Sequence, residues 1–327
     1  MRRFAINGYG EAQDVFEEID AHPREVGSGH VRVEIKAFSV NPYDVALRLG
    51  EMKEIRTLKF PYVPGNDGAG IVTEIGSDVT TVHVGDRVAV HAVGGTYGEE
   101  VVLPSAKVAK IPDKMSWEEA AGMVTPGITA YNLINHLTEI QPTDTVMILG
   151  ASGAVGSSLI QLLHEKGIRI LTSASSKNEE KVKKLGASAF AAYDKTNPGL
   201  QFADQADLVI DATKGSIKGE TGIQIMKPGG RYVALNDLPD LDLRQKKEGF
   251  YESFVPRKEY LDAEAFAGII KAYQKGAFHV FISMNLSASL KHVIQAHQLV
   301  EGHPPAGKIG SLSIRTDELC KIKSESE

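Results

Sequence analysis

Apolar and polar residues alternate along much of the first 115 residues, in short runs that glycine and proline interrupt. Alternation with a period of two is typical of half-buried antiparallel strands, in which successive side chains point to opposite faces. The runs that show it are "HVRVEIKAFSV", "GAGIVTEIG", "DRVAVHAV" and "EEVVLPSAKVAKIP". This part of the chain is therefore expected to form a β-rich barrel.

The pattern changes at "SWEEAAGM", where helical spacing replaces the alternation. Ser116 is followed three residues later by Glu119, and this pair predicts a capping box that begins a helix.

Beyond this helix, apolar runs alternate with helical stretches. The runs "TVMILGA" (145–151) and "IRILTSA" predict buried strands, and each precedes a predicted helix that ends at a glycine, Gly167 and Gly186 respectively. The runs "ADLVIDAT" and "RYVALN" predict later strands of the same kind. Strand–helix alternation requires a parallel sheet with right-handed crossovers, so this part predicts a doubly wound α/β domain.

A chain of 327 residues is long enough for about two domains, at roughly 100 to 200 residues each. After residue 258, "YLDAEAFAGIIKAYQKG" predicts an amphipathic helix, and "GKIGSLSI" (307–314) predicts a last strand. We expect both to pack back on the barrel, with "CKIKSESE" as a solvated tail. The predicted division is residues 1–117 for the first part of the barrel domain, 118–257 for the doubly wound domain and 258–327 for the return segment.

Composition and charge exclude several classes of protein. Apolar residues make up 42% of the chain and charged residues 24%, which is the balance of a globular protein with a packed core. The net charge of −6 repels nucleic acids and acidic membrane surfaces, so neither is an expected partner. No secretory leader or bilayer span is visible, and we expect a cytoplasmic protein. Cys320 is the only cysteine, which excludes an intrachain disulfide.

The segment "LGASGAVGSS" (149–158) lies between a predicted strand and a predicted helix and carries Gly150, Gly153 and Gly156. In this context, spaced glycines are typical of a dinucleotide-binding turn, although Ala151 replaces the expected first glycine. Gly153 would let the main chain approach a pyrophosphate, and Gly156 would let the helix pack closely on its strand. The alternative is a tight turn without a ligand.

The end of the next predicted strand indicates which dinucleotide binds. An acidic residue that holds the ribose hydroxyls of NAD is expected about 20 residues after the turn, but Ser173, Ser175, Ser176 and Lys177 stand there. A cation and hydroxyls suit a 2′-phosphate, so the sequence favours NADP(H). The alternative is that Ser176 and Glu179 form only a capping box and that Lys177 is solvated.

Further segments carry a resemblance to a known family: "SVNPYD" (39–44), "PGNDGAGIVTEIGSDVTTVHVGDRV" (64–88), "TAY" (129–131), "KKLGA" (183–187) and "PAGKI" (305–309). With them, the chain resembles the zinc-independent, zeta-crystallin-like quinone oxidoreductases of the medium-chain dehydrogenase/reductase superfamily. The resemblance implies a GroES-like β-barrel catalytic domain, an inserted Rossmann domain, a cleft in which the nicotinamide meets its acceptor, and a homodimer.

The resemblance also separates the chain from zinc-dependent alcohol dehydrogenases. Those relatives hold catalytic zinc with a Cys at the position that resembles Asn41, a His-Glu pair at the positions that resemble Asn66 and Asp67, and a later Cys. Amides are poor zinc ligands, and one aspartate cannot hold the metal alone, so no metal is expected. Alcohol oxidation then lacks a Lewis acid, whereas reduction of a quinone or an activated enone stays feasible.

By resemblance, Asn41 should face the nicotinamide ribose or the acceptor, and Tyr43 is a candidate proton source. The alternative for Asn41 is an asparagine that only caps the loop before Pro42. The family often reads R-x-G-x-Y after this loop, but here Met52 stands where the tyrosine is expected. The proton donor therefore stays open between a side chain and water.

The remaining candidates would contact the coenzyme. Ser152, Ala154 and Val155 belong to the glycine turn. The resemblance adds residues near the domain junction, beside the 2′-phosphate and along the nicotinamide: Thr129, Tyr193, Leu235, Phe254, Val255 and Lys308. For Thr129 and Tyr193 the alternatives are a hydroxyl bonded to its own helical turn and a half-buried tyrosine at a strand end.

The sequence thus favours an NADPH-dependent reductase that transfers hydride to a small-molecule electron acceptor, a quinone or an activated enone, without a metal. An NADPH-binding sensor or scaffold with little turnover is the alternative, because the family tyrosine is missing at Met52. Steady-state oxidation of NADPH with a panel of acceptors distinguishes the two.

Overall fold

The computed structural model describes residues 1–214, 219–302 and 306–313, and they form two compact units. Unit 1 comprises Met1–Thr125 and Phe281–Glu327, and unit 2 comprises Pro126–Val280. The predicted Cys320 tail and the end of the strand predicted at 307–314 lie outside the described residues. Among the described residues, no helix is both long and apolar enough to cross a membrane.

Unit 1 is built mainly from antiparallel strands, as the alternating pattern predicts. They are β1 (Arg2–Ile6), β2 (Phe16–Asp20), β3 (His30–Ser39), β4 (Asp67–Ile75), β5 (Arg87–His91), β6 (Glu100–Pro104), β7 (Val108–Lys110), β14 (Ile282–Ser287) and β15 (Lys308–Ser313). The strand β4 pairs along one edge of β3, and the other edge is shared by β6, next to the first half of β3, and β15, next to its end. The helices are α1 (Ala12–Val15), α2 (Pro42–Leu49) and α10 (Leu290–Glu301).

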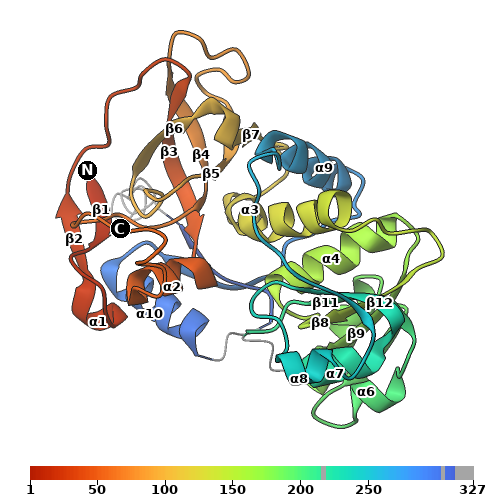
Figure 1. The fold of residues 1–327 in the computed structure, drawn as a ribbon. Helices are drawn as coiled ribbons and strands as arrows, with labels where there is room; N and C mark the ends of the chain where they lie inside the picture. Colours follow the sequence, from red (N-terminus) through yellow and green to blue (C-terminus); the bar gives the residue numbers. More distant parts are fainter. Residues whose placement is uncertain (215–218, 303–305, 314–327) are drawn as a thin grey trace, which may run out of the picture. The chain divides into compact units, whose positions relative to one another are not determined.

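Unit 2 is a doubly wound parallel sheet in the strand order β10-β9-β8-β11-β12-β13. Its strands are β8 (Thr145–Leu149), β9 (Arg169–Ala174), β10 (Ala189–Ala192), β11 (Ala206–Asp211), β12 (Met226–Ala234) and β13 (Gly249–Ser253). Its helices are α4 (Ala154–Glu165), α5 (Glu179–Lys184), α6 (Pro198–Gln201), α7 (Gly219–Ile225), α8 (Leu241–Arg244) and α9 (Asp262–Gln274). The helix α4 lies on one face of the sheet, with α6, α7 and α8 on the other (Figure 1). Every residue of β8 is buried, which accounts for its uninterrupted apolar run.

The helix α3 (Trp117–Asn132) begins in unit 1 and ends in unit 2. It starts as predicted, because the N–H of Glu119 donates to Ser116 Oγ (3.1 Å) and the N–H of Ser116 donates to Glu119 Oε2 (3.0 Å). The chain leaves unit 1 after Thr125, within this helix, rather than at residue 117.

The return to unit 1 also differs from the prediction. The helix α9 belongs to unit 2 and not to the barrel domain. Its Gly268 lies so close to Tyr131 of α3 that an added Cβ would stand 2.2 Å from the ring. After α9, the N–H of His279 donates to Gln161 of α4 (2.8 Å). The apolar face of α9 therefore packs inside unit 2, and only residues from Phe281 onward complete unit 1.

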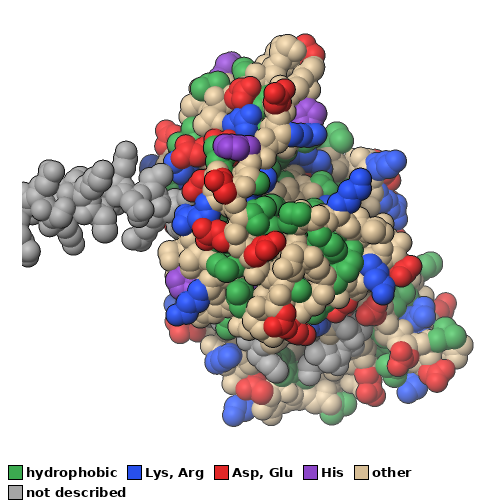
Figure 2. Space-filling model, turned by 90° about the vertical axis from the view of Figure 1, so that its left-hand side faces the viewer, with side chains coloured by type: hydrophobic (Ala, Val, Ile, Leu, Met, Phe, Trp, Pro, Cys, Tyr) green, Lys and Arg blue, Asp and Glu red, His purple; other side chains and the backbone are tan. Residues whose placement is uncertain are grey.

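Acidic and basic side chains are interspersed on the face of the molecule that Figure 2 shows. They do not gather there by sign, so this face carries no extended basic patch of the kind that binds a nucleic-acid backbone.

Candidate functional site

Asn41 stands at the point where β3 gives way to α2. It is the N-cap of that helix, and Pro42 at the first helical position needs no hydrogen-bond acceptor for its nitrogen. The backbone N–H of Asn41 donates to the Oδ2 atom of Asp44 at 2.8 Å. Asn41 therefore has the capping role that the sequence left open.

That side chain belongs to a buried polar group, the Asp67 cluster, which consists of Ser39, Asn41, Asp67, Thr125 and Lys308. Asp67 begins β4 with a side chain 0% exposed, and the side chain of Lys308, at the start of β15, is 4% exposed. The Lys308 ammonium contacts Asn41 Oδ1 and stands 3.3 Å from Asp67 Oδ2. Asn41 Nδ2 donates to the same Asp67 oxygen at 2.9 Å. The amide oxygen of Asn41 thus faces the Lys308 ammonium and its nitrogen faces the Asp67 carboxylate. These two contacts determine the orientation of the amide.

The Asp67 carboxylate has further donors. Thr125 of α3 donates its N–H to Oδ2 (3.2 Å) and its hydroxyl to Oδ1 (2.5 Å), and Ser39 Oγ lies 3.4 Å from Oδ2. Because a buried carboxylate is stable only when it is paired and hydrogen-bonded, these contacts compensate for its loss of water.

Burial also changes the titration of the neighbouring groups. Burial lowers the pKa of Lys308, although the negative charges of Asp67 and Asp44 counteract this effect. Burial, together with the nearby charge of Asp67, raises the pKa of Asp44 to about 7.

The Asp67 cluster does not fit a zinc ion. Its oxygen donors comprise one carboxylate, an amide and hydroxyls, whereas zinc in proteins prefers thiolate, imidazole and carboxylate ligands. The Lys308 ammonium already stands beside Asp67 as the cation of the cluster. Within the described part of the chain, no three His, Cys, Asp or Glu side chains converge in a way that could hold a metal ion.

Tyr43 lies on α2, two residues after Asn41, and is half-buried. Its hydroxyl accepts a hydrogen bond from Arg56 Nη1 at 3.0 Å. Met52, at the position of the missing family tyrosine, packs against the same hydrophobic core as Tyr43.

The glycine turn of unit 2 has the local geometry that its sequence predicts. Gly150 has a φ of +74°, and a Cβ at Gly156 would stand 2.4 Å from the carbonyl oxygen of Gly150. Ala151 is not among the residues with a positive φ, so replacement of the first glycine causes no backbone strain. Gly153 is the N-cap of α4, and the first amides of that helix lack acceptors within it.

The other coenzyme candidates of unit 2 gather at the carboxyl edge, which is the edge of the sheet where all six parallel strands end. Ser173 lies in β9 beside Leu149 of β8, and Ser175 to Lys177 follow that strand directly. Tyr193 follows β10, Leu235 follows β12, and Phe254 with Val255 follows β13. Parallel pairing brings these strand ends to one edge, which is where dinucleotides bind in doubly wound folds.

Thr129 is the exception, because it lies within α3, where its side chain is half-buried. Among the described residues, no hydrogen bond from its hydroxyl to its own helical turn is found. Ser152, Ala154 and Val155 lie in the turn and the first residues of α4, all partly exposed.

A carboxylate that the sequence interpretation missed reaches the end of β9. Asp194 Oδ1 accepts the N–H of Ser176 and its Oδ2 accepts the Ser176 hydroxyl, both at 2.7 Å. These hydrogen bonds lower the pKa of Asp194. Ser176 is therefore not engaged in a capping box with Glu179, while Lys177 is exposed. Asp194 lies two residues after β10, and the pairing of β10 with β9 brings it to the end of β9.

A second missed group lies at the same edge, around the end of β11. Asp211 accepts hydrogen bonds from the hydroxyls of Tyr232 (2.6 Å) and Thr213 (2.5 Å). Burial together with the charge of Asp211 raises the pKa of Tyr232 well above its ordinary range. The hydroxyls of Tyr232 and Thr213 thus hold the Asp211 carboxylate in place at the end of β11.

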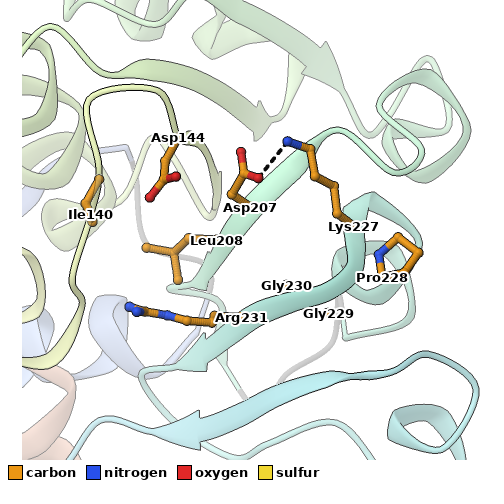
Figure 3. A pocket seen from close by; sticks show the side chains of 9 residues that line it. All are labelled: Ile140, Asp144, Asp207, Leu208, Lys227, Pro228, Gly229, Gly230 and Arg231. Carbon is orange, nitrogen blue, oxygen red and sulfur yellow. Dashed lines mark hydrogen bonds and ion pairs between the residues drawn. The ribbon is translucent and has the colours of Figure 1, made fainter.

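A cavity of about 230 Å³ lies at the opposite edge of the sheet. It is lined by Asp144, just before β8, by Asp207 at the start of β11 and by Arg231 of β12 (Figure 3). Asp207 pairs with Lys227 at 2.6 Å, so part of its charge is neutralised. The cavity adjoins the strand beginnings, whereas doubly wound folds bind dinucleotides at the carboxyl ends of their strands.

Comparison with known proteins identifies the class. The family "Alcohol dehydrogenase GroES-like domain" matches residues 27–113, and the family "Zinc-binding dehydrogenase" matches residues 185–309. A GroES-like domain followed by a parallel dinucleotide-type sheet is the architecture of this class, and the predicted fold is confirmed. The chain therefore contains a GroES-like alcohol dehydrogenase domain and a zinc-binding dehydrogenase domain, and its structural neighbours include quinone oxidoreductases of the medium-chain dehydrogenase/reductase superfamily.

Individual relatives cover most of the chain. The human synaptic vesicle membrane protein VAT-1 homolog is 30% identical over 243 residues, which is 71% of this chain and 60% of the relative, so the chain spans less than two thirds of that relative's length. The quinone oxidoreductase from Coxiella burnetii superposes with a TM-score of 0.83 and 26% identity, over 96% of this chain and 99% of that one. The Escherichia coli quinone oxidoreductase complexed with NADPH gives a TM-score of 0.84 at 21% identity, over 96% and 100%.

Proposed function

We propose that the chain is an NADPH-dependent reductase that passes hydride to quinones or activated enones without a metal ion. The observation that carries the proposal is the adjacency of two segments at the carboxyl edge of unit 2. The glycine turn follows β8, and Ser175 to Lys177 follow β9, the strand paired with β8. The similarity to quinone oxidoreductases, one of them solved with NADPH, supports the same class of reaction.

The residues of the carboxyl edge fit a phosphorylated dinucleotide. Gly153 and the first amides of α4 would hold the pyrophosphate, because these N–H groups lack acceptors within the helix. The serine hydroxyls and the exposed Lys177 would hold the 2′-phosphate. When bound, the nicotinamide supplies a hydride equivalent to the acceptor.

Asp194 adds a condition to this assignment. It occupies both donors of Ser176, so a 2′-phosphate must exchange places with a carboxylate at that residue. We infer that Asp194 moderates the preference for NADPH over NADH, while Lys177 creates it.

In this proposal, the Asp67 cluster positions the Asn41 amide and does not bind a metal ion. Lys308 and Asp67 hold the Asn41 amide in one orientation. Asn41 would therefore present a fixed donor to the coenzyme or the acceptor. Orientation of this kind supplies much of the acceleration in a direct transfer reaction.

We further propose that the chain forms a homodimer through unit 2. The strand β13 is the outer strand of the six-stranded sheet, and its Phe250 is 72% exposed. An exposed edge strand with a large apolar side chain is suited to pairing with a second copy. Sedimentation analysis tests this, and a monomer at micromolar concentration would contradict it. A cytoplasmic location stays a prediction.

Coenzyme preference is tested by calorimetry with NADPH and NADH. Lys177→Glu should weaken NADPH binding by about 10- to 100-fold, the value of a charged hydrogen bond, and NADH binding by much less. Asp194→Asn should shift the preference toward NADPH. Lys184→Glu, which makes the same charge change on an exposed, ion-paired lysine of α5, is the matched control. Equal losses for both coenzymes in Lys177→Glu would mean that the phosphate site is misplaced.

Turnover is tested separately, by oxidation of NADPH with a panel of quinones and enones. Measurable reduction is expected for at least one acceptor class. Tight NADPH binding without turnover on any acceptor would instead support the sensor or scaffold alternative that the absence of a tyrosine at position 52 suggests.

A further inference from the structure

Arg56 joins three separate segments of unit 1 through its guanidinium group. Its Nη1 donates to the hydroxyl of Tyr43 on α2 at 3.0 Å. Its Nη2 donates to the hydroxyl of Tyr62, shortly before β4, at 2.7 Å and to the carbonyl oxygen of Val93, after β5, at 3.0 Å. Sequence reasoning did not single out Arg56, because its partners are separated from it by turns and loops.

Tyr62, one of the hydrogen-bond partners of Arg56, is itself held in place by its neighbours. The backbone of Tyr62 pairs with Ile6 in both directions, at 2.8 and 2.9 Å, which ties it to β1. Gly94, with a φ of +94°, lies so close that an added Cβ would stand 2.0 Å from the Tyr62 hydroxyl. The guanidinium also lies over the Tyr62 ring, 5.5 Å from its centroid. These contacts therefore hold the Arg56 guanidinium in one position next to Tyr43.

The two tyrosines differ in what happens to their protons. The Tyr62 hydroxyl donates to the carbonyl oxygen of Val93 at 3.3 Å, so its proton is in use. The Tyr43 hydroxyl accepts from Arg56, and a guanidinium can only donate. Within the described part of the chain, the Tyr43 proton meets no protein acceptor, and the side chain is only half-buried. It can therefore be donated to a ligand.

Arg56 stays charged in this setting. Burial by itself lowers the pKa of Arg56, but its hydrogen bonds with Tyr43 and Tyr62 outweigh burial and raise it. A permanent cation bound to a phenol oxygen stabilises the phenolate that remains when the proton leaves.

We propose that Tyr43 is the proton donor of the reductase and that Arg56 is the residue that positions and activates it, in place of the tyrosine replaced by Met52. This inference rests on the proposed function. The acceptor gains a hydride at carbon as NADPH becomes NADP⁺, and the electron pair of its π bond moves onto oxygen. The O–H bond of Tyr43 breaks, and its proton forms the new O–H bond of the product. The phenolate on Tyr43 stays bound to Arg56 and regains a proton from water.

Kinetics of matched variants test the assignment. Tyr43→Phe should lower kcat by about 100-fold or more, the value of a general acid, and leave the KM for NADPH unchanged. Arg56→Met should lower kcat by about 10- to 100-fold, and Arg56→Lys should recover part of it because the charge remains. Arg32→Met is the control, since Arg32 pairs with Glu74 (2.9 Å) and Glu100 (3.2 Å) and contacts no tyrosine. A kcat within threefold of the unmodified protein in both Tyr43→Phe and Arg56→Met would overturn the proposal.

A binding measurement distinguishes failure of this inference from failure of the proposed function. The probe is para-nitrophenol, whose absorption separates phenol from phenolate. The protein should bind the phenolate form, and Arg56→Met should abolish that preference while Arg56→Lys retains it. If no acceptor is reduced but the Arg56-dependent preference is found, the proposed function fails, whereas the role of Arg56 in stabilising a phenolate is supported. If acceptors are reduced and no preference is found, the role of Arg56 is wrong. Circular dichroism of each variant verifies that it is folded.

Discussion

The Asp67 cluster of unit 1 and the carboxyl edge of unit 2 are built from different kinds of chemical groups. The cluster consists of side chains that are nearly all buried and already bonded to one another, with Lys308, Asn41 and Asp67 in mutual contact. The carboxyl edge consists of backbone amides, glycines and partly exposed side chains, and near the end of β9 Ser176 donates two hydrogen bonds to Asp194.

This difference separates two tasks. Separating buried, paired charges costs much free energy. The side chains of the Asp67 cluster are therefore expected to keep one arrangement when a ligand binds. An edge of unsatisfied amides gains hydrogen bonds when a phosphate binds. Changes in the Asp67 cluster should therefore be measured first in stability, and changes at the carboxyl edge first in coenzyme affinity.

The largest effect is expected from Lys308→Met, which removes the cation beside Asp67. A buried carboxylate without its partner destabilises a protein by about 3 to 5 kcal/mol. Denaturant unfolding of the variant measures this loss. Lys110→Met is the matched control, because Lys110 pairs with Asp86 at 2.8 Å with half of its side chain exposed, and such pairs contribute at most about 1 kcal/mol. Equal losses in the two variants would show that the cluster is not an electrostatic unit.

Asp44→Asn should change how stability depends on pH. Because the pKa of Asp44 is raised to about 7, the folded protein binds this proton more tightly than the unfolded chain does. The contribution of this carboxyl to stability is then largest below about pH 4 and is lost as the pH rises to about 7. The variant should gain on the unmodified protein across that window, by at most about 4 kcal/mol. Unfolding curves at pH 4 to 8 measure the difference, and parallel curves would refute it.

Gly156→Ala and Gly153→Ala should separate packing from binding at the carboxyl edge. A Cβ at Gly156 meets backbone at 2.4 Å, so this variant should lose about 1 to 3 kcal/mol of stability and also coenzyme affinity. A Cβ at Gly153 meets only one atom, at 3.3 Å, and this variant should lose affinity with much less effect on stability. Thermal unfolding and calorimetry with NADPH distinguish the two effects. If Gly153→Ala bound NADPH normally, the pyrophosphate would lie elsewhere.

The smallest effect is expected for Ser116→Ala, at the start of α3. Loss of the capping hydrogen bond to Glu119 should destabilise the protein by about 1 kcal/mol. Urea unfolding measures it, and NADPH affinity should be unchanged, since this cap belongs to neither functional region.

Local sequence signals predicted most of the fold and one half of the candidate site. The apolar run of β8, the glycines around α4 and the end of β9 lie within 30 residues of one another, so their arrangement follows from short-range geometry. The capping box of α3 was predictable for the same reason. The helix α9 was placed in the wrong unit, because an amphipathic face indicates burial but not the surface against which it is buried.

The contacts that complete the site are long-range and leave little trace in local patterns. Lys308 reaches Asn41 across 267 positions, and nothing near either residue indicates the pairing. Asp194 reaches Ser176 only because β10 and β9 are neighbours in the sheet. Arg56 lies in a segment without periodicity, so only the folded chain reveals which hydroxyls it meets.

Unit 1 is discontinuous along the chain, and this has a consequence for how the protein is made. While the ribosome is still producing residues before 308, Asn41 and Asp67 have emerged but their ammonium partner does not yet exist. Unit 2, in contrast, is continuous and has all of its strands and helices by residue 280. Unit 2 can therefore complete its folding during synthesis. The Asp67 cluster of unit 1, in contrast, can form only after β15 has left the ribosome.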